Sequence, residues 1–179
     1  MSDPAELPIF KYYPDPVAGG SVEASDAACA GCKRRRGFIS PSLLYAEKVP
    51  DDARFCPWCI ADGSATALFG GTFNELAAGA SDDARDEVEQ RTPNFMTWQD
   101  WFWPVHCQDG CVYLGSPPRG ELRKYPDACE SVAQELRSIG WAEQDITDMI
   151  DGLDPSGHAV GYLFRCFHCG THVAVWDTD

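Results

Sequence analysis

Nine cysteines dominate the chemistry that this sequence offers, and two close pairs of them lie in the N-terminal third. Two residues separate Cys29 from Cys32, and two separate Cys56 from Cys59. A zinc ion takes four ligands in a tetrahedron, with sulfur at about 2.3 Å. A two-residue gap lets one tight turn direct two thiolates at one ion, and two such turns complete the tetrahedron. These four cysteines therefore predict a structural zinc site.

A second set of four cysteines lies in the C-terminal half. Three residues separate Cys107 from Cys111, two separate Cys166 from Cys169, and 54 residues lie between these pairs. Gly170 follows the last cysteine and supplies the positive φ that such a turn needs. We therefore predict a second structural site, and two Zn²⁺ ions per chain.

The sequence leaves the partition of the cysteine pairs open. Proximity along the chain favours joining the first two pairs, but the first pair could also join Cys166 and Cys169. His106 and His168 adjoin cysteines and are alternative ligands, although a supporting or surface position is the simpler interpretation. Cys129, the ninth cysteine, is expected to be an unpaired, partly buried thiol. Its alternative is a redox role, because a helix N-terminus lowers a thiol pKa.

We expect no enzymatic activity. A catalytic zinc ion keeps one coordination position open, whereas each predicted set already supplies four protein ligands. The sequence contains no His-x-Glu, His-Glu-x-x-His or Gly-x-Ser-x-Gly motif. Cys56-Pro57-Trp58-Cys59 resembles the Cys-Pro-x-Cys motif of thiol–disulfide oxidoreductases, but Gly63 interrupts the helix expected after it. A redox protein that uses Cys56 and Cys59 is the alternative.

The net charge of −14 limits the choice of partner. Nucleic-acid binders carry a basic surface, so DNA or RNA binding is disfavoured. The basic run at residues 33–36 is expected to offset the neighbouring thiolates, and a nucleic-acid-binding zinc ribbon is the alternative. An acidic surface attracts basic molecules, so a protein partner of basic character is predicted. Without a signal-peptide pattern or a long apolar run, we expect a cytosolic protein that does not enter a membrane.

Turn residues and apolar periodicity predict an α+β fold with two zinc-ribbon-like β modules and a helical hairpin inserted in the second. The modules are expected at residues 1–80 and 81–179. Ser81 is a candidate N-cap, and Asp127 with Glu130 matches a capping box. The expected elements are an extended arm at 7–13, a short strand at 37–39, helices at 73–76, 81–90, 127–139 and 143–150, and strands at 161–164 and 173–176.

An aromatic-rich stretch covers residues 95–103. Trp98, Trp101 and Phe102 lie at helical spacing, which favours packing in the core. If part of this stretch is exposed, we expect it to bind a partner, because tryptophan anchors interfaces.

Several segments resemble the CbrC family of bacterial proteins. The most specific string is Cys56-Pro57-Trp58-Cys59-Ile60-Ala61-Asp62-Gly63-Ser64. The others are residues 7–16, 91–93, 98–99, 105–107 and 162–170, so the resemblance covers nearly the whole chain. It implies the four cysteine pairs, no catalytic residue, and a connection to tolerance of a nuclease colicin, which makes a basic toxin nuclease one expected partner.

Overall fold

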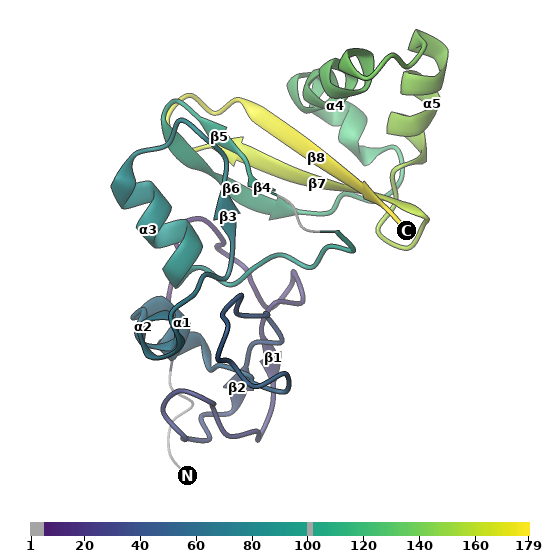
Figure 1. Ribbon diagram of the computed structural model, residues 1–179. Helices are drawn as coiled ribbons and strands as arrows, with labels where there is room; N and C mark the ends of the chain where they lie inside the picture. Colours follow the sequence, from purple (N-terminus) through teal and green to yellow (C-terminus); the bar gives the residue numbers. More distant parts are fainter. Residues whose placement is uncertain (1–5, 100–101) are drawn as a thin grey trace.

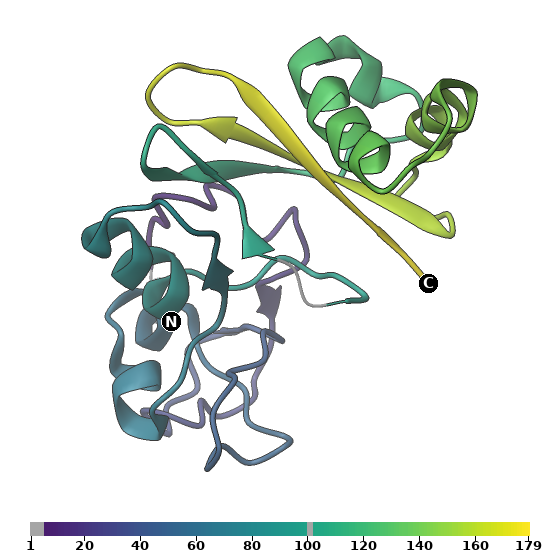
Figure 2. The same ribbon diagram turned by 45° about the horizontal axis from the view of Figure 1, so that its top comes forward.

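A four-stranded antiparallel sheet lies at the centre of the computed structural model, which describes residues 6–99 and 102–179. Its strands, in spatial order, are β5 (Val105–His106), β6 (Asp109–Gly115), β7 (Ala159–Cys166) and β8 (His172–Thr178). Figures 1 and 2 show helices α4 and α5 on one side of this sheet, and α3 with the N-terminal chain on the other. The predicted mixture of helices and strands is confirmed.

Strand β7 is apolar almost throughout because both faces of the sheet are covered. Successive strand residues point to opposite faces. Tyr162 and Phe164 accordingly belong to the larger core cluster, whereas Leu163 between them packs with the helical hairpin. The same alternation holds in β8, where Ala174 faces the hairpin and Val175 the larger cluster.

The helical hairpin lies between β6 and β7 in the chain, as predicted. A 3₁₀ turn, Glu121–Lys124, leads into α4 (Pro126–Ser138), and α5 (Glu143–Gly152) follows. The start of α4 differs from the predicted capping box. Pro126 occupies the first helical position, where its missing N–H costs nothing. The Asp127 carboxylate instead accepts the backbone N–H of His172, at 2.7 Å, which ties α4 to β8.

The N-terminal half contains short elements connected by loops. The strand predicted at residues 37–39 is β2 (Phe38–Ile39). The arm predicted at residues 7–13 is not part of a strand. The remaining elements are β1 (Glu23–Ala24), β2 (Phe38–Ile39), α1 (Pro57–Ala61), α2 (Ser64–Phe69), β3 (Glu75–Leu76), α3 (Asp82–Arg91) and β4 (Phe102–Trp103). The zinc-ribbon description of the two modules, and their boundary near residue 80, stay predictions.

Helix α3 confirms the predicted helix and its cap. The Ser81 hydroxyl accepts the N–H of Ala84, at 3.3 Å, in the usual manner of an N-cap. The predicted helix at residues 73–76 is wrong. Glu75 and Leu76 form a short parallel strand beside β4, and the Leu76 N–H donates to the Glu89 carboxylate instead of to a helical carbonyl. This segment is too short to form a helix without such tertiary partners.

The aromatic stretch is divided between core and surface. Trp103 and Phe95 are buried, and their rings meet at right-angled geometry with centroids 5.5 Å apart. Trp98 and Phe102 are about half exposed, so the prediction that they pack in the core is wrong. The reason is that β4 replaces the expected helix, and its alternation turns Phe102 outward. Trp101 lies outside the described residues.

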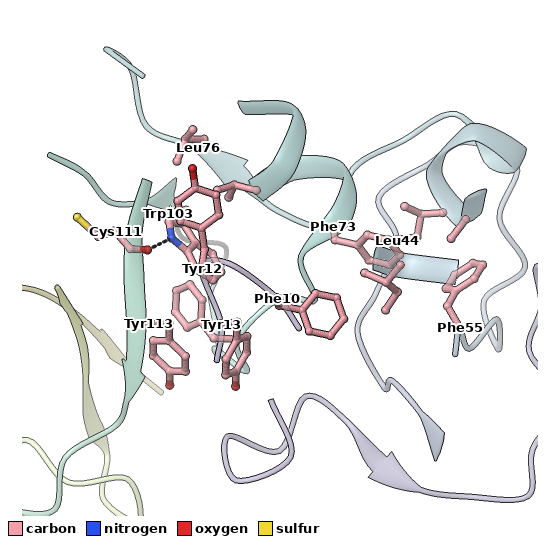
Figure 3. Packing of buried hydrophobic residues seen from close by; sticks show 14 of the residues in the cluster. Phe10, Tyr12, Tyr13, Leu44, Phe55, Phe73, Leu76, Trp103, Cys111 and Tyr113 are labelled. Atoms are coloured by element: carbon pink, nitrogen blue, oxygen red, sulfur yellow. Dashed lines mark hydrogen bonds between the residues drawn. The ribbon is translucent and has the colours of Figure 1, made fainter. Parts of the chain in front are cut away.

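Aromatic packing continues from Trp103 to the strand that leads away from the second cysteine set. The indole Nε1 of Trp103 donates a hydrogen bond to the backbone oxygen of Cys111 at 2.6 Å (Figure 3). Tyr13 from the N-terminal arm meets Tyr113 edge-on, with centroids 4.9 Å apart. The arm is thus part of the core of the sheet. Within the described chain, no helix has the length and apolar character needed to span a membrane.

Candidate metal centres

The first group joins the two N-terminal cysteine pairs. The ligand atoms of Cys29, Cys32, Cys56 and Cys59 all lie within 4.8 Å of one another. The sulfur atoms of Cys32 and Cys56 are 3.9 Å apart. Two thiolates bound to one tetrahedral zinc ion, each at 2.3 Å, are about 3.8 Å apart. The four sulfur atoms therefore have the spacing that a single ion requires.

A tight turn and a helix start hold these sulfur atoms. The first pair lies in a turn that Lys33, with a φ of 62°, closes by donating its N–H to the Cys29 carbonyl at 2.9 Å. Cys56 is the N-cap of α1, and Cys59 lies in its first turn. Gly63, with a φ of 73°, separates α1 from α2, so the helix after this motif has only five residues. Its shortness agrees with the sequence argument against a redox motif.

The first group lies inside the larger core cluster, and burial controls its ionisation. Burial opposes a charge on Cys29, yet N–H groups of Cys56, Cys32 and Gly31 lower the pKa of its thiol to about 7. Burial raises the pKa of both Cys56 and Cys59. Metal binding must therefore displace protons from buried thiols, and affinity falls as the pH falls.

The second group differs from the predicted set in one ligand. The ligand atoms of His106, Cys107, Cys166 and Cys169 lie within 4.8 Å of one another. The His106 Nδ1 atom is 3.3 Å from the sulfur atoms of both Cys107 and Cys169, which are 3.8 Å apart. The predicted ligand Cys111 lies outside this group. His106, an alternative in the sequence analysis, occupies its place.

A two-residue turn explains the choice of His106. His106 pairs with Asp109 across β5 and β6, so Cys107 and Gln108 alone form the turn between these strands. Both turn residues have a positive φ, 51° and 62°. Such hairpin turns favour asparagine and glycine, so Cys-Gln gives no warning of one. Cys107 lies in this tight turn and His106 directly precedes it, and the ligand atoms of both residues belong to the same group.

Cys111 is a neighbour of the group but not a member of it. It lies opposite Cys166 in the pairing of β6 with β7 and is fully buried. Its N–H donates to the Pro104 carbonyl at 2.9 Å, and its carbonyl accepts the Trp103 indole. Figure 3 shows the side chain of Cys111 directed away from that indole. Cys111 is therefore a buried strand residue beside the group.

Asp109 connects the second group to the N-terminal arm. Its Oδ2 atom is 2.9 Å from Nε2 of His168 and 3.3 Å from the Lys11 ammonium, and its Oδ1 atom accepts the Tyr12 hydroxyl. Burial opposes its charge, but the hydrogen bonds from Tyr12 and His168 hold the pKa of Asp109 below its usual value. His168 therefore has a supporting position, as the simpler interpretation expected.

The two groups differ in access to solvent. Cys107 and Cys169 are exposed, whereas three cysteines of the first group are buried. The hydroxyl of Thr171 lies 3.2 Å from the Cys169 sulfur and lowers the pKa of that thiol to about 6. The hydrogen bond with Cys169 raises the pKa of Cys107 to about 11. Of these two exposed thiols, Cys169 therefore loses its proton more readily, and the thiolate is the form that binds a metal.

Comparison with known proteins places the chain in a family. The model described as "Uncharacterised protein family (UPF0167)" matches residues 7–178. The chain belongs to the UPF0167 family. A UPF0167 protein of Mycobacterium bovis is 39% identical over 180 residues, covering 98% of this chain and 96% of the relative. Another, of Pseudomonas aeruginosa, is 36% identical over 177 residues, covering 97% of each. No solved structure matches the chain.

The donor sets of this UPF0167 chain fit zinc. One group offers four sulfur atoms, and the other offers three with one imidazole nitrogen. Zinc occupies tetrahedral sites of both kinds in proteins. The comparisons support the UPF0167 family, and the CbrC name stays a resemblance. The chain therefore has two groups of side chains, four cysteines in one and three cysteines with a histidine in the other, at the spacing of metal ligands.

Proposed function

We propose that this UPF0167 protein is a zinc-stabilised cytosolic protein that binds a basic protein partner and does not catalyse a reaction. The observation that carries the structural part is the mutual 4.8 Å limit on the ligand atoms of each group. Each set supplies four protein ligands, so a tetrahedral ion has no position left for water or substrate. The metals then stabilise the fold on which a binding surface is built.

The charge of the chain supports a basic partner. The net charge is −14 before any metal binds. A zinc ion adds two positive charges, whereas loading deprotonates four thiols in one group and three in the other. The loaded protein is thus still more acidic than the metal-free one, and it attracts basic proteins at long range. The resemblance to the CbrC family adds a nuclease colicin as one candidate, with tolerance of that toxin as the process.

Two alternatives use residues in the first group or beside it. A nucleic-acid site would use the basic run at residues 33–36, but the Arg36 guanidinium already lies over the Trp58 ring, 3.9 Å from its centroid. A redox site would use Cys56, which stands at a helix start but is fully buried among other thiols. The buried Cys56 thiol is therefore not accessible for redox chemistry, and the cations of Lys33, Arg34 and Arg35, although exposed, are opposed by a net charge of −14.

Thiol titration with and without a chelator tests the proposal. Cys107 and Cys169 are exposed, so a thiol reagent would modify them at once if no metal bound them. We expect both to stay protected in the purified protein and to react after a strong chelator is added, together with the first group. Rapid modification of one or two cysteines before chelation would contradict the zinc assignment and would favour redox chemistry.

A further inference from the structure

A groove separate from both metal groups runs between the N-terminal arm and the sheet. Its volume is about 860 Å³. Four parts of the chain line it: the arm at Tyr13, the loop at Trp98, the chain after β6, and β7 at Tyr162. None of the metal-group residues is among the lining residues. The groove is therefore a surface feature whose role the metals do not explain.

Tyrosine rings and prolines give this groove rigid, apolar walls. Tyr13 and Tyr113 pack edge to face (Figure 3), and their hydroxyls lie within 3.2 Å of Ser21 and Ser116 respectively. The buried ring of Tyr162 lies beside them. Four prolines complete the walls: Pro14, Pro117, Pro118 and Pro155. Because these walls are already fixed, the protein loses little conformational entropy when a ligand binds.

Three large apolar side chains of the groove remain in contact with solvent. Met96 is 54% exposed, Trp98 51% and Leu114 43%. Exposed apolar side chains that cluster at a concave surface mark binding sites more often than single, scattered apolar side chains do. Tryptophan is the side chain that most often anchors a protein partner. The groove thus has the composition of a docking surface.

The loop that carries Trp98 is fixed in place. The Oδ2 atom of Asp177, at the end of β8, accepts the N–H groups of Trp98 and Gln99 at 2.7 and 2.9 Å. Asp177 is only 2% exposed, so these hydrogen bonds are shielded from water. Trp98 is therefore presented at a defined position before any partner arrives.

Both charged residues that line the groove are acidic. Asp15 and Glu121 are the charged residues that line it, and no lysine, arginine or histidine is among the described lining residues. Glu121 also pairs with Lys124, while Arg119 of the same loop interacts with Asp154.

A buried carboxylate adds to this negative field. Asp177 lies opposite Val160, a lining residue, in the pairing of β7 with β8, so both side chains lie on the groove face of the sheet. Its Oδ1 atom has no hydrogen-bond partner among the described residues, and its charge acts on Tyr162. A cation in the groove would compensate this charge.

We propose that this groove binds an extended, proline-containing segment that carries arginine, supplied by a basic protein partner. The inference deepens the proposed function and rests on it for the kind of partner. A guanidinium stacks on aromatic rings and pairs with carboxylates at the same time. A proline-rich segment is extended before it binds and docks in grooves lined by aromatic rings. The half-exposed ring of Trp98 and the carboxylates of Asp15 and Glu121 supply both contacts.

Charge separates this occupant from two others. A second copy of the chain carries a net charge of −14, and nucleic acid is a polyanion, so the groove repels both. A short apolar peptide would pack on Trp98 but would leave Asp15 without a cation. The arginine of the segment is therefore essential to the proposal.

Fluorescence anisotropy of a labelled peptide of three Arg-Pro-Pro repeats tests the groove. We expect the full-length, metal-loaded protein to bind it, and to bind a peptide of three Glu-Pro-Pro repeats far more weakly. Trp98→Ala is expected to raise the Kd at least about tenfold, and the double variant Asp15→Asn/Glu121→Gln about fivefold. The matched controls are Trp141→Ala, a tryptophan 41% exposed on the helical hairpin, and Asp51→Asn/Glu47→Gln, exposed acids away from the groove.

The outcomes separate this inference from the proposed function. If the arginine peptide binds equally to wild type and to both groove variants, the groove assignment is wrong, while a basic partner still binds elsewhere. If the arginine peptide binds neither the wild type nor any variant, the inference is also wrong. The metal content of the same sample tests the proposed zinc sites independently of peptide binding. Equal binding of the two peptides, or detection of dimers in place of peptide complexes by sedimentation, would refute the charge argument.

Discussion

Cys56→Ser is expected to lose the first metal ion and to unfold the N-terminal part of the core. Cys56 is fully buried, and its N–H donates to the Cys29 sulfur at 3.2 Å, so it connects both halves of the group. A structural zinc ion contributes about 10–16 kcal/mol of apparent folding free energy in small peptides. Whole domains are stable by about 5–15 kcal/mol. Loss of this ion therefore removes a folding free energy comparable to the entire stability of the fold.

Thermal unfolding followed by near-ultraviolet circular dichroism measures this effect. The variant should lose the sharp transition of the wild type and its aromatic signal, because Phe55 and the cysteines share one core cluster. Cys129→Ser is the matched control. Cys129 is partly buried and lies outside both groups, and its thiol lies 3.3 Å from the Leu122 carbonyl, to which a serine hydroxyl can also donate. It should change stability by about 1 kcal/mol or less. A Cys56→Ser protein that melts like the wild type would refute the structural role.

His106→Ala is expected to remove the second metal ion, and Cys111→Ala is expected to keep it. The His106 Nδ1 atom lies within 3.3 Å of two sulfur atoms of the group, whereas Cys111 lies outside it. Removing a ligand opens the site to water and lowers its affinity, while trimming a buried thiol costs only about 1–2 kcal/mol of stability. The metal count should fall from two to one in the first variant and stay at two in the second.

A chromophoric chelator gives the measurement. Titration of each variant with limiting chelator should show weak, rapidly released metal in His106→Ala alone, with the first group unaffected. The pattern predicted from the cysteines alone is the reverse. If Cys111→Ala releases one ion and His106→Ala retains both, four sulfur atoms bind the second metal and His106 is not a ligand.

The elements with a strong periodic pattern could be predicted from the sequence. Helix α3 begins at its predicted cap Ser81, the helical hairpin of α4 and α5 appears between β6 and β7, and β7 and β8 flank the last cysteine pair. Each of these segments is long enough for its apolar spacing to determine its structure. The first cysteine group could also be predicted from the sequence, because both of its pairs have the two-residue spacing of a metal-binding turn.

Short segments and unusual turns could not be predicted. The segment at Glu75 and Leu76 is a strand only because β4, far along the chain, pairs with it. The turn at Cys107 and Gln108 requires a positive φ at two residues that rarely adopt it, so the sequence favoured Cys111 over His106 as a ligand. The exposure of Trp98 depends on Asp177, which lies 79 residues away and holds its loop. These contacts are tertiary, and local pattern does not encode them.

Metal content per folded chain is the measurement that tests the central claim most directly. Native mass spectrometry of protein purified without a tag and without added metal, combined with elemental analysis, gives both the number and the identity of the ions. We predict two zinc ions per chain, released together only when the protein is denatured or chelated. A folded protein with no bound metal, or with one ion distributed over both groups, would contradict the claim that each group of four side chains holds its own structural ion.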